Sequence, residues 1–135
     1  MAAWGETLLT DVGHLMSRDL FTLGRWSLPL TVFAIVGVMN AINMTDGVDG
    51  LAVTNVLCAC LGFGLAAVLA GNGVIFTVLC LTGGAAAGFF VYNARLPGRG
   101  PAPVYMGDGG SLLLGLLLAW CAIELAMGER AAIAP

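Results

Sequence analysis

The stretch LPLTVFAIVGVMNAINMTDGVDGL, residues 28–51, is an uninterrupted apolar run that ends among polar residues. Its apolar part, residues 28–44, has about the length that an α-helix needs to cross a bilayer, roughly 17 to 25 residues. Four polar residues at intervals of three mark its end: Asn40, Asn43, Asp46 and Asp49. The stretch therefore predicts a membrane-spanning helix whose end carries a polar cluster.

The composition of the whole chain agrees with a lipid environment. Of its 135 residues, 59% are hydrophobic and 10% are charged, whereas a soluble domain has about 25% charged residues. We therefore expect an all-α integral membrane protein surrounded by membrane lipid. Its five arginines are scattered and it has no lysine, which does not fit a nucleic-acid-binding surface. The four cysteines lie in apolar stretches, where cysteine is usually a small hydrophobe.

Four apolar stretches are long enough to span the bilayer, and they form a predicted membrane domain over residues 26–135. Because backbone groups in lipid must bond within their own segment, continuous apolar runs favour helices. The expected spans are about 28–44, 51–70, 74–92 and 111–127. Residues 1–25 are mixed in polarity and are expected to lie outside the bilayer, as an extracytoplasmic or interfacial segment that contains either a short strand pair or an interfacial stretch.

The order of the spans places the two polar loops on one face of the membrane. If each span crosses once, residues 45–50 and 93–110 share a face, and the Gly-Asn-Gly turn at 71–73 lies on the other. Counting arginines does not orient the chain, because two lie on the first face and three on the second. The shared face is where polar residues concentrate, so we expect any functional site there.

The residue types on this face favour a metal-assisted phosphate chemistry. Asn40, Asn43 and Asp46 would line one side of a helix end, and Asp49 can turn back towards the same space. In the second loop, Asp108 precedes the fourth span, with Ser111 as a candidate helix cap. Ordinary turns and caps are the alternative explanation. Carboxylate and amide oxygens without histidine or cysteine suit magnesium and a phosphate ligand.

Two motifs on this face resemble those of a known family. NAINMTDGVDGLA, residues 40–52, and VYMGDGGSLLLG, residues 104–115, resemble two hallmark motifs of the polyprenyl-phosphate N-acetylhexosamine-1-phosphate transferases, glycosyl transferase family 4. The resemblance implies a multi-pass enzyme of the bacterial inner (plasma) membrane with cytoplasmic active-site loops. Such an enzyme transfers a sugar-1-phosphate from a UDP-N-acetylhexosamine to a polyprenyl phosphate such as undecaprenyl phosphate and releases UMP. This reaction initiates lipid-linked cell-envelope glycan synthesis.

The resemblance also implies roles for individual residues. Asp108 matches the family's magnesium-binding aspartate, with manganese as the alternative ion, and is expected to be catalytic together with Asp46 and Asp49. The substrate-binding positions are expected to be Asn40, Asn43, Asp46, Asp49 and Asn93, of which Asn93 matches an asparagine associated with nucleoside recognition. A homodimer is one assembly that the sequence allows.

The chain also departs from the family pattern. Members carry an upstream aspartate-rich motif and a downstream histidine-rich loop, whereas the single histidine here, His14, is expected on the opposite face. We therefore expect a central part of a larger multi-span bundle. The insertion RLPGRGPAP, residues 95–103, favours the GlcNAc-1-phosphate branch, with the phospho-MurNAc-pentapeptide branch as the alternative. Outside the family, the alternative is a non-catalytic cation-binding transport protein.

Overall fold

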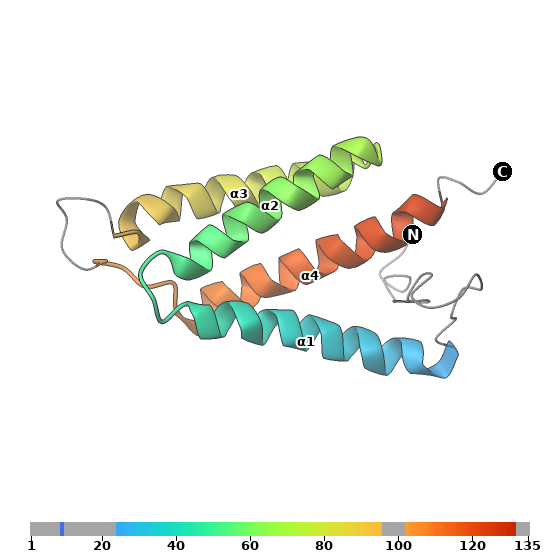
Figure 1. The fold of residues 1–135 in the computed structure, drawn as a ribbon, viewed down its shortest axis with the longest axis horizontal. Helices are drawn as coiled ribbons and strands as arrows, with labels where there is room; N and C mark the ends of the chain where they lie inside the picture. The colour runs from blue at the N-terminus through green and yellow to red at the C-terminus, as the bar shows by residue number, and fades with distance from the viewer. Residues whose placement is uncertain (1–8, 10–23, 96–101, 132–135) are drawn as a thin grey trace.

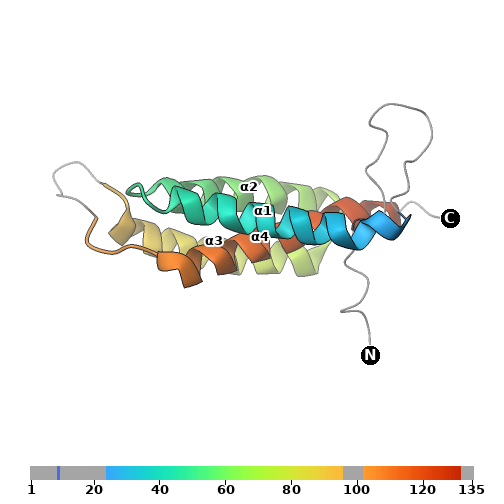
Figure 2. The same cartoon turned by 90° about the horizontal axis from the view of Figure 1, so that it is seen from below.

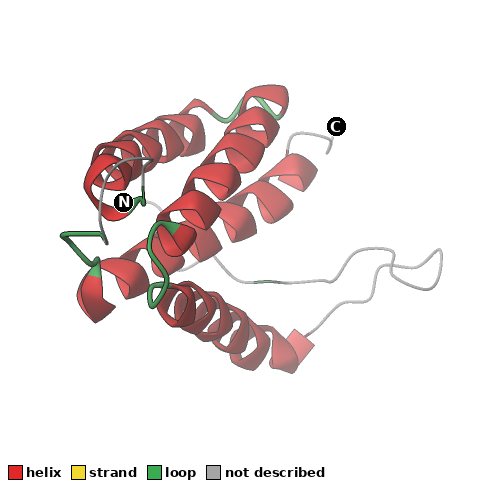
Figure 3. Ribbon diagram, turned by 60° about the vertical axis from the view of Figure 1, so that its left-hand side comes forward, coloured by secondary structure: helices red, strands yellow, loops and turns green. Residues whose placement is uncertain are grey.

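The computed structural model describes Leu9 and residues 24–95 and 102–131, and these residues form four long helices with a short 3-10 turn before the first. The elements are η1 (Gly24–Trp26), α1 (Ser27–Thr45), α2 (Leu51–Leu69), α3 (Gly73–Asn93) and α4 (Gly107–Ala131). No strand occurs in the described part of the chain (Figure 3). The prediction of an all-α membrane protein is confirmed, since all four helices are long and apolar enough to cross a bilayer.

The first three predicted spans agree with the helices to within one residue at each end, but the fourth does not. Its helix begins at Gly107 rather than at 111 and continues to Ala131. The sequence Gly107-Asp108-Gly109-Gly110 has the composition of a turn, because glycine is a poor helix former. Contacts with the end of α1, described below, stabilise this segment in the helical conformation. The predicted segment 1–25 lies almost entirely outside the described residues.

The turns between helices follow from local chemistry. At the α2–α3 turn, Gly71 adopts a φ of +68°, and the side chain of Asn72 caps α3 by accepting a hydrogen bond from the backbone N–H of Ile75 at 3.1 Å. Asparagine is among the preferred N-cap residues, and glycine tolerates positive φ. The tight turn predicted at 71–73 is therefore confirmed.

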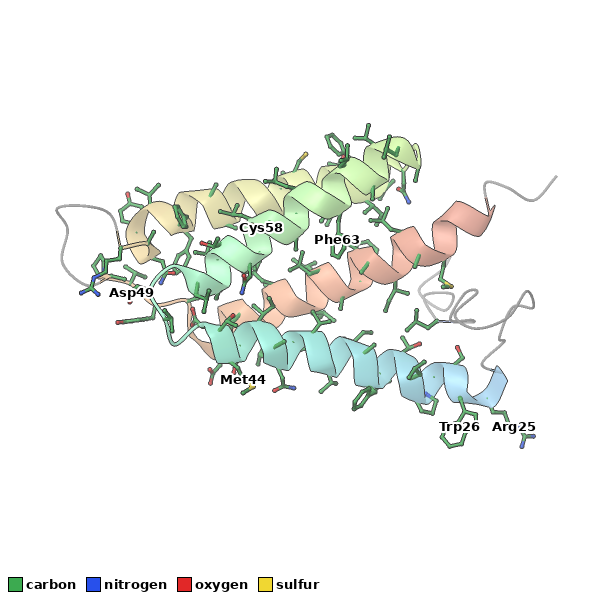
Figure 4. All side chains as sticks on the ribbon, viewed as in Figure 1. Arg25, Trp26, Met44, Asp49, Cys58 and Phe63 are labelled. Carbon is green, nitrogen blue, oxygen red and sulfur yellow. The ribbon has the colours of Figure 1, made fainter. Side chains whose placement is uncertain are left out.

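The helices pack mainly as two pairs, α1 with α4 and α2 with α3 (Figures 1 and 2). The buried core lies where α2, α3 and α4 meet and includes Val56, Leu79 and Leu118. Phe63 of α2 packs against this core and is seen between α2 and α4 in Figure 4. The second pair is therefore joined to the first chiefly through α4.

The outer surface of the bundle is apolar. Phe33 of α1 is 76% exposed, and Leu61 of α2 and Leu81 of α3 are similarly exposed. Contiguous exposed apolar side chains on this scale would be unfavourable in water and are expected when the surrounding medium is lipid. The chain is therefore a multi-pass membrane protein, with these side chains facing lipid or further membrane helices.

Both long loops lie at one end of the bundle. Figure 1 shows the end of α1, the start of α2, the end of α3 and the start of α4 together, with the α2–α3 turn at the opposite end. Figure 4 places Asp49 at this loop end and Arg25 and Trp26 at the other end, beside the start of α1. The two polar loops therefore lie at the same end of the bundle, as expected from the order of the spans.

Candidate active site

The candidate site is formed where two connecting segments meet at the loop end of the bundle. We call residues 46–50, between α1 and α2, the first loop, and residues 94–106, between α3 and α4, the second loop; residues 96–101 of the latter lie outside the described part. The side chains of four residues hold these segments together. Three of them belong to the end of α1 or to the first loop and bind the second loop or the start of α4, and the fourth belongs to the end of α3 and binds both loops. Their hydrogen bonds define the geometry of the site.

The closest link between the two motifs joins α1 to α4. The side-chain amide Nδ2 of Asn43 donates to Asp108 Oδ1 at 2.9 Å and also to Ser111 Oγ at 2.9 Å. Asn43 lies in the last turn of α1, whereas Asp108 lies in the first turn of α4, 65 residues further along the chain. An amide–carboxylate bond of this length is a strong, charge-assisted hydrogen bond. It fixes the position of one oxygen of Asp108.

The two aspartates of the first loop bind the backbone around the second loop. Asp46 Oδ2 accepts a hydrogen bond from the N–H of Gly107 at 2.9 Å, and Asp49 Oδ2 accepts one from the N–H of Ala102 at 3.2 Å. Gly107 has a φ of +71°, which glycine adopts without the cost that a side chain would impose. Each aspartate therefore uses one carboxylate oxygen to hold the first loop in place, Asp46 against the start of α4 and Asp49 against the second loop.

Asn93, at the end of α3, is the buried link between the loops. Its Oδ1 accepts a hydrogen bond from the N–H of Gly50 at 3.1 Å, and its Nδ2 donates to the carbonyl of Val104 at 2.8 Å. The side chain is only 1% exposed. A buried amide that lost these partners would carry a large desolvation cost, so both bonds constrain the two loops.

Asn40 does not take part in these contacts. Its Nδ2 donates to the backbone carbonyl of Val36 one turn earlier at 2.8 Å, and the residue is exposed. Residues three apart lie on the same side of a helix, so this contact alone does not exclude Asn40 from the surface shared with Asn43 and Asp46. The role of Asn40 in substrate binding stays a prediction.

Ser111 differs from the expected N-cap. It lies one turn inside α4, is fully buried, and its Oγ contacts the backbone carbonyls of Gly107 at 3.0 Å and Asp108 at 3.2 Å. The expectation that it precedes the helix was wrong, because α4 begins at Gly107. Its contact with Asn43 was not predicted from the sequence. In the sequence, the only indication that Ser111 belongs to the site was its position three residues after Asp108.

The electrostatics of the site are dominated by three carboxylates. Asp46 and Asp49 are half-buried and Asp108 is exposed. Within the described ranges, no basic side chain forms an ion pair with any of the three. Three negative groups in adjoining segments, with no basic partner among the described residues, favour binding of a cation, since nearby like charges repel one another.

The donor atoms available fit a hard metal ion. Asp108 Oδ2 and Asn43 Oδ1 accept no hydrogen bond from any described residue, so both oxygens remain free to bind a ligand. Among the described residues, no three histidine, cysteine, aspartate or glutamate side chains converge as a preformed metal cluster. Magnesium is commonly bound by one or two protein oxygens together with water and substrate phosphates, so this small donor set suits it.

The fold and site thus define a class: a multi-pass helical membrane protein with an oxygen-rich site at one end of the bundle. Comparison with known proteins identifies the family, because residues 1–126 match the profile of glycosyl transferase family 4. The chain belongs to glycosyl transferase family 4. The resemblance of the two motifs to this family is thereby confirmed.

Several curated relatives share about two fifths of their residues with the chain. A phospho-N-acetylmuramoyl-pentapeptide-transferase of Streptococcus thermophilus is 43% identical over 103 residues, covering 76% of the chain and 29% of that protein. Proteins of the same name from Chlamydia muridarum and Streptococcus mutans are 41% and 40% identical, each over 93% of the chain. The chain spans 38% and 40% of their lengths. No solved structure matches the chain.

The names of these relatives test which branch of the family the chain resembles more. The length of the insertion at residues 95–103 favoured the GlcNAc-1-phosphate branch, with the phospho-MurNAc-pentapeptide branch as the alternative. The relatives named here all belong by name to the second branch, so they support the alternative better. Loop length was a poor guide because surface loops accept insertions at little energetic cost.

Proposed function

We propose that the chain supplies the nucleotide-sugar-binding and metal-binding part of a phospho-N-acetylmuramoyl-pentapeptide transferase. The donor would be a UDP-N-acetylhexosamine carrying the pentapeptide, the acceptor a polyprenyl phosphate, and the released product UMP. The names of the relatives support the donor branch. Nucleotide sugars are cytoplasmic, so we infer that the two loops face the cytoplasm of a bacterial cell and that the bundle lies in its plasma membrane.

The reaction exchanges one phosphorus–oxygen bond for another. An oxygen of the polyprenyl phosphate attacks the sugar-bearing phosphorus of the donor, and the bond from that phosphorus to the bridging oxygen of UMP breaks. UMP leaves with the bonding electron pair, and the lipid retains the sugar through a diphosphate. Such transfers depend on positioning and on stabilisation of charge more than on covalent participation of the protein.

The observation that carries this proposal is the hydrogen bond of 2.9 Å between Asn43 and Asp108. It brings the two sequence motifs together at the loop end of the bundle. We infer that this end lies at the membrane boundary, where a soluble donor and a lipid acceptor can both reach. Either motif taken alone could be explained as an ordinary turn or helix cap without a binding function. Their free oxygens on neighbouring helix ends support a site that binds a cation and, through it, a diphosphate.

The residues present fit a magnesium ion, with manganese as the alternative. Asp108 Oδ2 would hold the ion, with Asn43 Oδ1 on the neighbouring helix end as a further oxygen donor, and the bound ion would neutralise negative charge on the diphosphate. Asp46 and Asp49 each have a second carboxylate oxygen that can accept hydrogen bonds from ribose or sugar hydroxyls. Asn93 would support nucleoside recognition by fixing the two loops.

Binding of two donors to the purified chain in detergent tests this proposal. With magnesium present, calorimetry should give tighter binding for UDP-MurNAc-pentapeptide than for UDP-GlcNAc. Asn43→Ala should weaken binding, whereas the matched Asn55→Ala, at an exposed position of α2 outside the cluster, should not. Tighter binding of UDP-GlcNAc would favour the other branch, and binding of neither donor would contradict the proposal.

A further inference from the structure

Ser111 is the most completely buried polar side chain in contact with the site, with an exposed fraction of 0%. It is not among the positions for which the family motifs suggested a role in binding or catalysis. Its hydroxyl lies against both the first turn of α4 and the side chain of Asn43. Its effect on the site depends on the direction of these hydrogen bonds.

The hydroxyl proton of Ser111 is directed into its own helix. A serine hydroxyl has one proton to donate and two lone pairs. The nearby acceptors for that proton are the backbone carbonyls of Gly107 at 3.0 Å and Asp108 at 3.2 Å. With the proton placed there, a lone pair of Ser111 Oγ faces Asn43. Ser111 therefore accepts a hydrogen bond from Asn43 rather than donating one.

This direction determines which end of the Asn43 amide faces the site. Both acceptors on this side, Ser111 Oγ and the carboxylate oxygen of Asp108, require the NH2 group, and each lies 2.9 Å from Nδ2. Both Nδ2 protons are then used. Turning the amide over would place its carbonyl oxygen against the Asp108 carboxylate, which repels it, and would lose two hydrogen bonds.

We propose that Ser111 is a positioning residue that holds the amino group of Asn43 on Asp108 and so presents Asn43 Oδ1 to the ligand. The atom of the Asn43 amide that remains for a ligand is then an acceptor. The group bound there must be a cation or a hydrogen-bond donor, and it cannot be an unprotonated phosphate oxygen in direct contact with Asn43. The consequence for the ligand rests on the proposed function, whereas the orientation of the amide does not.

Proton exchange of side-chain amides tests the orientation directly. The chain contains five asparagines and no glutamine, so asparagine labelled with nitrogen-15 gives five NH2 pairs in an NMR spectrum. In Ser111→Ala, we expect one Nδ2 proton of Asn43 to exchange with water about fivefold faster, the factor expected for loss of one typical hydrogen bond. The signals of Asn72 and Asn93 serve as internal controls.

Two further variants separate positioning from general loosening. Ser111→Thr keeps the hydroxyl and should retain slow exchange at Asn43. Ser27→Ala removes another buried serine, at the opposite end of the bundle, and should leave Asn43 unchanged. Unchanged exchange in Ser111→Ala, or equally fast exchange in Ser27→Ala, would overturn the assignment of Ser111.

Manganese alone is the probe for the ligand. Free manganese measured by electron paramagnetic resonance should show about fivefold weaker binding in Ser111→Ala and restored binding in Ser111→Thr, in proportion to the lost hydrogen bond. If amide exchange rises but manganese affinity does not change, the part of the inference that concerns the ligand is overturned. If the unaltered chain binds no manganese, the metal site of the proposed function fails, while amide exchange still decides the role of Ser111.

Discussion

The backbone of Met39 in α1 occupies the space that a side chain at Gly115 of α4 would need. A Cβ added at Gly115 would lie 2.6 Å from the Cα of Met39 and 3.2 Å from its nitrogen. Real Cβ atoms do not approach backbone atoms so closely, so the absence of a side chain allows α1 and α4 to pack. This contact lies one turn from Asn43 and from Ser111, and it therefore sets the spacing of the site.

Gly115→Ala should destabilise the bundle because the two backbones must move apart. Overpacking of this kind typically costs about 1 to 3 kcal/mol. The measurement is thermal unfolding in mild detergent, followed by circular dichroism. Gly88→Ala is the matched control, since a Cβ there would meet nothing within 4 Å, and it should be neutral or slightly stabilising. Equal unfolding temperatures for the two variants would contradict the close contact.

Gly50→Ala should lower stability for two separable reasons. Gly50 has a φ of +77°, which costs an alanine roughly 1 to 2 kcal/mol, and the added Cβ would lie 3.2 Å from the Cα of Ala94. Gly71→Ala isolates the first effect, because Gly71 has a φ of +68° with nothing within 4 Å of an added Cβ. We expect the first variant to unfold at the lower temperature, and the reverse order would show that the loops do not meet at Gly50.

The positions of the helices could be predicted from the sequence because lipid leaves few alternatives. Uninterrupted apolar runs gave the ends of α1, α2 and α3 to within one residue, since every backbone group in lipid must bond within its helix. The turn at Gly71 could be predicted because glycine and asparagine have specific conformational roles there. These features depend only on local sequence and on the solvent.

The start of α4 and the partners within the site could not be predicted in the same way. Local propensity disfavours a helix through Gly107, Gly109 and Gly110. The contact of Gly107 with Asp46, 61 residues earlier in the chain, overrides this preference. Asp46 and Asp49 bind backbone N–H groups, whose positions no pattern of side chains reveals. The sequence identified Asn43 and Asp108 as candidates but not the hydrogen bond that joins them.

Asp108→Asn should preserve the fold and weaken metal binding. The amide oxygen of the new side chain can still accept from Asn43 Nδ2, so the link between α1 and α4 is retained. The negative charge is lost, and manganese affinity measured by electron paramagnetic resonance should fall at least tenfold. At the equivalent position of a full-length relative, loss of a charge-stabilising group should reduce UMP release roughly a hundredfold or more. Unchanged turnover at limiting magnesium would contradict the role of Asp108.

Asp46→Ala and Asp49→Ala should weaken binding of the UDP-sugar more than binding of the metal. Each substitution removes a carboxylate that can accept a hydrogen bond from a hydroxyl of the UDP-sugar. It also removes the hydrogen bond that holds the first loop to the start of α4, for Asp46, or to the second loop, for Asp49. Asp46→Asn separates these effects because it keeps an acceptor for the N–H of Gly107. Calorimetry with the donor should show a larger loss for alanine than for asparagine. Unchanged donor affinity together with lost turnover would indicate a direct role in the chemistry instead.

The 135-residue polypeptide by itself should not release UMP. Family resemblance implies that an aspartate-rich motif and a histidine-rich loop help to position the lipid phosphate and the diphosphate, and the sequence contains neither. Because phosphoryl transfer depends on several positioned groups together, the site around Asp108 should bind ligands without turnover. The assay supplies purified chain, UDP-MurNAc-pentapeptide, undecaprenyl phosphate and magnesium, with a full-length relative as the positive control. UMP release that Asp108→Asn abolishes would show that these residues suffice for catalysis.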